Sequence, residues 1–98
     1  MNKREATRSL RAEARKLRAL PYPQLVDRLA DKKLSLETVA PSGATYHIEA
    51  EGFWDDRAEH ELRVVMSIDD GGLRTLLPIT DSFTIAPNGA IIESSPAG

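Results

Sequence analysis

Five arginines recur at helical spacing near the start of this 98-residue chain. On a helix they would form one stripe about 21 Å long; they are Arg4, Arg8, Arg11, Arg15 and Arg18. Guanidinium groups form paired hydrogen bonds to phosphates and carboxylates, so such a row can follow a nucleic-acid backbone or an acidic protein surface. The stripe therefore predicts an anion-binding or nucleic-acid-binding site. The alternative is a solvated helix back that the acidic remainder of the chain partly neutralises.

Carboxylates and histidines supply the second candidate chemistry. Aspartate pairs occur at 55–56 and 69–70, and the two histidines, His47 and His60, have acidic neighbours. Such side chains could bind a divalent cation or transfer protons. However, the H-E-x-x-H, calcium-loop, P-loop, G-x-G-x-x-G and G-x-S-x-G patterns are all missing from the sequence. We therefore predict no catalytic residue, no metal site and no cofactor, and interpret both aspartate pairs as turn residues.

Three apolar side chains form the third candidate. Trp54 lies in a polar stretch, and tryptophan is enriched at the centre of protein interfaces. Val65 and Leu76 fall opposite each other on the outward face of a hairpin if its turn is Asp70-Gly71. We predict that Trp54, Val65 and Leu76 mark the edge of a partner-binding or dimer surface. The alternative for Phe53 and Trp54 is that one ring closes the end of the core while the other covers a sheet edge.

Apolar periodicity predicts the elements that must position these residues. An amphipathic helix over 3–20 has its apolar seam on the side away from the arginines, and a second helix runs from Pro23 to about residue 32. From residue 34 the period changes to two, as in half-buried strands. Strands are expected over 34–39, 45–51 and 61–69, with a polar loop over 52–60.

Turn signals predict the rest of the sheet. Asp70-Gly71 favours a two-residue hairpin that pairs Ile68 with Leu73 and leads to a fourth strand ending at Pro78. Residues 80–82 then turn, and a second hairpin at 88–89 joins 83–86 to 90–92. The predicted fold class is α+β, with two N-terminal helices packed on one face of a five-stranded antiparallel β-meander, or a six-stranded one.

Length and apolar pattern predict one domain over 1–98, with a helical pair at 3–32, the sheet at 34–93 and a flexible tail at 94–98. One core should join the helices to the sheet. Its expected members are Leu10, Leu17, Leu25, Leu29, Tyr46, Ile48, Val64, Met66, Ile68 and Leu77.

Charge and cysteine content limit the class of protein. Residues 1–20 hold seven Lys or Arg against two Glu, whereas the other 78 residues hold six basic and thirteen acidic side chains. The chain has no cysteine, which excludes disulfides and thiolate metal sites and favours a cytoplasmic location. No apolar stretch approaches the ~20 residues that cross a bilayer, so no membrane association is expected.

Several short motifs resemble those of a family of short uncharacterised bacterial proteins. They are FWDD at 53–56, SIDDGG at 67–72 and PITDSF, of the form P-x-TD-x-F, at 78–83. The resemblance covers nearly the whole chain and implies a bacterial origin and a complete protein. The family carries no established activity, so the resemblance implies no catalytic residues.

These patterns together predict a non-catalytic interaction protein that acts through a protein partner or a homodimer, and not an enzyme. The alternative is a small nucleic-acid-associated protein that uses the basic N-terminal helix.

Overall fold

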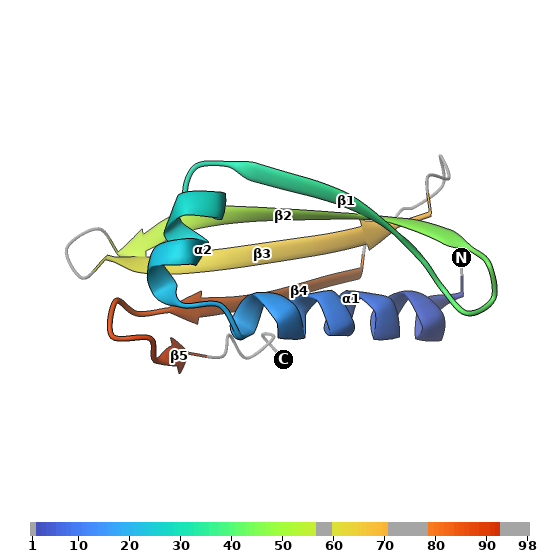
Figure 1. Ribbon diagram of the computed structural model, residues 1–98, viewed down its shortest axis with the longest axis horizontal. Helices are drawn as coiled ribbons and strands as arrows, with labels where there is room; N and C mark the ends of the chain where they lie inside the picture. The colour runs from blue at the N-terminus through green and yellow to red at the C-terminus, as the bar shows by residue number, and fades with distance from the viewer. Residues whose placement is uncertain (1, 57–59, 71–78, 93–98) are drawn as a thin grey trace.

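Two helices and five strands make up the described part of the chain. The computed structural model describes residues 2–56, 60–70 and 79–92. The elements are α1 (Lys3–Arg18), α2 (Tyr22–Leu29), β1 (Lys33–Val39), β2 (Thr45–Asp56), β3 (Glu61–Asp69), β4 (Ile79–Ile85) and β5 (Ile91–Ile92). The strands follow one another in an antiparallel sheet of order β1-β2-β3-β4-β5, and both helices lie on the same side of it (Figure 1). The predicted fold class is confirmed, with five strands.

The long helix α1 begins at Asn2, whose side-chain oxygen accepts a hydrogen bond from the backbone N–H of Glu5 at 3.1 Å. This cap satisfies a backbone donor that has no partner within the helix. Its buried side chains are Ala6, Leu10, Ala14 and Leu17. They pack mainly on β3 and β4, so α1 lies along one half of the sheet (Figure 1).

The second helix is shorter than the sequence predicts. Ala30 already has extended backbone angles and forms an isolated bridge with Gly52 of β2. The N–H of Asp31 then donates to the carbonyl oxygen of Gly52 at 3.1 Å. The chain therefore leaves the helix after Leu29 because its backbone groups find partners in the sheet.

Gly52 makes this close approach of α2 and β2 feasible. A Cβ atom at this position would lie 2.7 Å from the backbone oxygen of Leu29 and 2.9 Å from its carbonyl carbon. Both distances are below ordinary van der Waals contact, and the obstructing atoms belong to the backbone. Any residue other than glycine would push α2 away from the sheet.

A carboxylate ties the start of α1 to the β1–β2 hairpin. Glu5 Oε1 accepts hydrogen bonds from the hydroxyl of Ser42 at 2.6 Å and from the hydroxyl of buried Tyr46 at 2.9 Å. These two bonds hold the pKa of Glu5 below its usual value, and the bond from Ser42 has the larger effect. Burial, together with the bond to Glu5, raises the pKa of Tyr46.

The core lies where expected. Nine predicted members are buried: Leu10, Leu17, Leu25, Leu29, Tyr46, Ile48, Val64, Met66 and Ile68. The tenth, Leu77, lies outside the described residues, as does the predicted tail at 94–98. Phe83 and Ile85 of β4 and Leu62 of β3 complete the sheet side of the core.

The predicted polar loop over 52–60 is wrong in its first half. Strand β2 continues to Asp56, and its pairing with β3 runs through Phe53 opposite Arg63 and Trp54 opposite Leu62. Aromatic residues favour extended backbone, and here they continue the alternation begun at Tyr46. The aspartates at 55–56 therefore belong to a strand and not to a turn.

The predicted Asp70-Gly71 hairpin is also wrong. Ile68 pairs with Ile79 and not with Leu73, so the link between β3 and β4 is longer than two residues. Residues 80–82, which we expected to turn, lie inside β4. The observed register sets Phe83 opposite Val64, and both side chains are fully buried. The predicted fourth strand, at 72–78, lies outside the described residues.

The second hairpin is confirmed. Gly89 has a φ of 90°, which favours glycine, and its N–H donates to the carbonyl oxygen of Ala86 at 2.8 Å. The turn joins β4 to the short strand β5.

Candidate interaction surfaces

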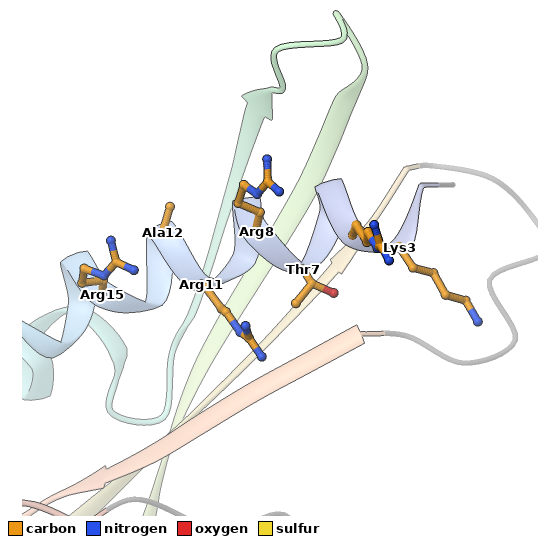
Figure 2. A pocket seen from close by; sticks show the side chains of 7 residues that line it. Lys3, Thr7, Arg8, Arg11, Ala12 and Arg15 are labelled. Carbon is orange, nitrogen blue, oxygen red and sulfur yellow. The ribbon is translucent and has the colours of Figure 1, made fainter.

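Four of the five predicted arginines form one exposed surface on α1. They are Arg4, Arg8, Arg11 and Arg15, and with Lys3 they surround an open depression on the helix (Figure 2). Figure 2 shows Arg8 and Arg15 on the same side of the helix as Ala12, and Arg11 on the neighbouring side with Thr7. We call this surface, made of the four arginines, Lys3, Thr7 and Ala12, the arginine face.

Among the described residues, no salt bridge is formed by the four arginines of the arginine face, although the charge of Arg8 acts on the nearby carboxylate of Glu5. The ion pairs among the described residues involve other cations, namely Lys16, Arg18, Lys33 and His47. Within residues 2–56, 60–70 and 79–92, no salt bridge therefore links the acidic sheet to these four arginines, and the alternative of a solvated helix surface stays a prediction. Their charge faces solvent and is available to an external anion.

Arg18 departs from this pattern, because it lies at the edge of the buried side of α1. At 100° per residue it is about 40° from buried Ala14, closer than any other arginine of the stripe. Its guanidinium donates to Asp81 Oδ1 at 3.3 Å and to the carbonyl oxygen of Ser82 at 3.4 Å. It also lies 5.0 Å from the centre of the Phe83 ring. Arg18 thus ties α1 to β4, and the candidate anion-binding set is reduced to the other four.

The predicted grouping of Trp54, Val65 and Leu76 does not hold. Trp54 is paired with buried Leu62 and packs against the core on the helical side of the sheet. Val65 alternates with buried Val64 and Met66, so it lies on the opposite face. Leu76 lies outside the described residues, and the register places Val65 between Glu51 and Ser82 and not opposite Leu76.

Trp54 instead closes one end of the core. Its ring meets His60 edge-on, with ring centres 6.4 Å apart. The hydroxyl of Tyr22 donates to the carbonyl oxygen of His60 at 2.6 Å, which links α2 to the same corner. Phe53 points the other way and is 46% exposed. Of the two interpretations of Phe53 and Trp54, the structure favours the one in which Trp54 closes the end of the core and Phe53 lies on the sheet surface.

The side of the sheet away from the helices is strongly acidic among the described residues. Strand alternation places five carboxylates on it, namely Glu37, Glu49, Glu51, Glu61 and Asp69, and a sixth, Asp55, is exposed where the β2–β3 register shifts after Trp54. The basic residues there are Lys33 and Arg63. Phe53 and Val65 lie beside Glu49 and Glu51 in a shallow depression. We call this surface the acidic sheet face. The sequence signal that could have identified it is the alternation of inward and outward residues, which continues from Ile48 through Trp54.

Lys33 is engaged within the acidic sheet face. Its ammonium lies 3.1 Å from Glu49 Oε2 and 3.8 Å from Glu51 Oε1. The hydrogen bond and charge of Glu49 raise the pKa of Lys33 above its usual value. The remaining carboxylates still give this face a negative charge.

The histidines and aspartate pairs are not gathered into one site. His47 Nδ1 lies 3.7 Å from Glu37 Oε1 on the acidic sheet face, whereas His60 follows β2 at the corner near Trp54. Within the residues that the structure describes, no group of three metal-ligating side chains occurs. Asp55 is exposed on the acidic sheet face.

Comparisons with protein-family models, curated proteins and solved structures found no match for this chain. The resemblance to a bacterial family stays a prediction. Neither described helix has the length and apolarity needed to span a membrane.

Proposed function

We propose that this chain is a non-catalytic interaction protein whose arginine face binds an acidic surface of a protein partner. The observation that carries the proposal is the row of four exposed arginines, none of which forms a salt bridge with a described residue. Guanidinium groups in such a row can form paired hydrogen bonds to the carboxylates of an acidic protein surface. We further propose a cytoplasmic location, because a secreted domain of this size usually carries disulfides and this chain has no cysteine.

Two features favour a protein surface over nucleic acid. The chain as a whole has a net charge of −2, and the acidic sheet face would repel a long polyanion that bends around the domain. The described residues of the arginine face also include no aromatic side chain on which a base could stack. Nucleic acid is therefore the competing outcome of the test.

The test is an NMR titration of the isotope-labelled protein with two probes, an acidic peptide made of Glu and Asp and a short DNA duplex. Both titrations are run at about 20 mM and about 200 mM salt, where screening of exposed charges differs strongly. The expected result is that the peptide shifts the backbone amide signals of residues 4–15 in α1. The signals of α2 serve as the internal control and should not move.

Two results would contradict the proposal. If neither probe shifts the signals of α1 at low salt, the arginine face is only a solvated helix surface. If the duplex binds more tightly than the peptide at both salt concentrations, the chain is a nucleic-acid-associated protein instead.

A further inference from the structure

The molecule carries opposite charges on opposite sides. The arginine face looks outward from the helical layer, and the acidic sheet face looks outward from the other side of the single sheet. Because the core and the sheet lie between them, the two faces cannot reach each other within one copy. Each face is therefore complementary to the same chain in another orientation.

The charged rows of the two faces are similar in length. Successive residues of the arginine stripe rise about 5 Å along α1, since they are three or four positions apart at 1.5 Å per residue. Successive outward positions of β2 lie about 7 Å apart. Glu49, Glu51 and Asp55, with Phe53 between the last two, span about 20 Å of β2, and Arg4 to Arg15 span about 16 Å of α1, so the two rows can lie side by side when α1 of one copy is placed along β2 of another.

The uncharged residues of the two faces also match. Phe53 stands exposed within the acidic sheet face, next to Val65. On the arginine face, the small side chain of Ala12 lies between Arg8 and Arg15, whereas Thr7 lies on the other side with Arg11 (Figure 2). An aromatic ring seated on Ala12 would contact its methyl group and have the guanidinium groups of Arg8 and Arg15 beside it, which is a favourable arrangement.

We propose that the acidic sheet face of one copy is the partner of the arginine face of the next, so that the protein associates head to tail. This inference rests on the proposed function and names the acidic surface as that of a second copy. Because the two faces lie on opposite sides, two copies joined in this way still have one arginine face and one acidic sheet face uncovered. Association of this type continues beyond a dimer and ends only by closing into a ring.

The test uses two variants that each neutralise one face. The helix variant removes three charges of the arginine face: Arg8→Gln, Arg11→Gln and Arg15→Gln. The sheet variant removes three carboxylates along β2: Glu49→Gln, Glu51→Gln and Asp55→Asn. Each has a control with the same change in net charge at positions outside the two faces. The helix control is Lys16→Gln, Arg28→Gln and Lys32→Gln, and the sheet control is Glu13→Gln, Asp27→Asn and Asp31→Asn.

Sedimentation equilibrium at about 20 mM salt should show a wild-type mass that rises with concentration past twice the 10.8 kDa of one chain. Both controls should behave in the same way. The helix variant and the sheet variant should each associate about tenfold more weakly. Mixing these two variants should produce a complex that stops at one copy of each, because only one complementary pair of faces remains.

A second pair of variants tests the uncharged contact. Phe53→Ala should weaken association several-fold with no change in charge. Val39→Ala removes another apolar side chain on this side of the sheet, 68% exposed at the end of the edge strand β1 and away from β2 residues 49–55, and should have no effect. Circular dichroism spectra establish that both remain folded.

The inference is overturned if the wild type stays at the mass of one chain under these conditions. It is also overturned if the variants associate as well as their controls, or if the mixture of variants does not associate. The proposed function survives these results if the acidic peptide still shifts α1. Conversely, if the peptide does not bind but the head-to-tail complex forms, the arginine face is specific for the sheet of its own chain.

Discussion

Replacing Arg18 with glutamine should destabilise the fold while leaving the arginine face unaffected. The substitution removes the hydrogen bonds from the guanidinium to Asp81 and to the carbonyl oxygen of Ser82, and its contact with the Phe83 ring. These interactions join the last turn of α1 to the middle of β4, two elements that are far apart in the sequence. They are therefore interactions that the unfolded chain lacks.

The size of the effect follows from partial burial. The side chains of Arg18 and Asp81 are 24% and 25% exposed. An exposed ion pair contributes about 0.2–1 kcal/mol and a buried charged hydrogen bond about 1.5–3 kcal/mol, so an intermediate value of about 1 kcal/mol is reasonable for this pair. The ring contact adds about 0.5–1 kcal/mol. A loss of about 1.5–2 kcal/mol would lower the Tm of a domain of this size by about 6–16 °C.

Thermal and urea denaturation of Arg18→Gln, Asp81→Asn and the double variant measure this directly. The double-mutant cycle should give a coupling of about 1 kcal/mol between the two side chains. The control is Arg11→Gln, which should change stability by no more than about 0.5 kcal/mol. Our assignment of Arg18 to the fold is refuted if Arg18→Gln is as stable as Arg11→Gln, or if it weakens binding of the acidic peptide while Arg11→Gln does not.

Three further predictions concern the scaffold. Gly52→Ala should cost about 1–3 kcal/mol in urea denaturation, since the new Cβ meets the backbone of Leu29; equal stability would contradict this contact. Met66→Ala should cost about 2–5 kcal/mol, because the side chain is 1% exposed; a smaller loss would contradict its central position. The lowered pKa of Glu5 means that its bonds from Ser42 and from Tyr46 contribute stability above pH 4.5 that is lost as pH falls through the folded pKa. In Glu5→Gln, the free energy of unfolding should therefore fall less as the pH is lowered than it does in the wild type. An unchanged dependence of this free energy on pH would contradict the role of Glu5.

The order of the elements and most of the core could be predicted from sequence because their signals are local. Pro21 separates two amphipathic helices and Pro23 lies in the first turn of the second, and the alternation from Tyr46 to Ala50 shows which face of β2 is buried. Asn88-Gly89 gave a correct hairpin because strands of suitable length lie directly on either side.

The register of β4 could not be predicted because a strong local signal competed with a non-local one. Asp70-Gly71 favours a tight turn, but that pairing would have placed Thr75 opposite Met66 in the core. The observed register places Asp81 there, and Arg18 from α1 supplies its partner. Such a pairing depends on a contact between distant parts of the chain, which periodicity does not reveal.

Helical spacing predicted most of the arginine face correctly, and the same spacing led to the wrong assignment of Arg18. Spacing alone places all five arginines on one stripe, but the width of the buried side of α1 decides which remain exposed. The grouping of Trp54 with Val65 failed because it depended on where β2 ends. With β2 extended to Asp56, alternation separates Trp54 from Val65 and places Phe53 beside Val65 instead.

The affinity of the acidic peptide for the helix variant, compared with that for the helix control, tests the central claim most directly. Both lose three positive charges, and one loses them from the arginine face while the other loses them elsewhere. Calorimetric titration at about 20 mM salt should show binding to the control close to that of the wild type, and binding to the helix variant about tenfold weaker. Equal weakening of both proteins would show that only net charge matters and would contradict a binding site on α1.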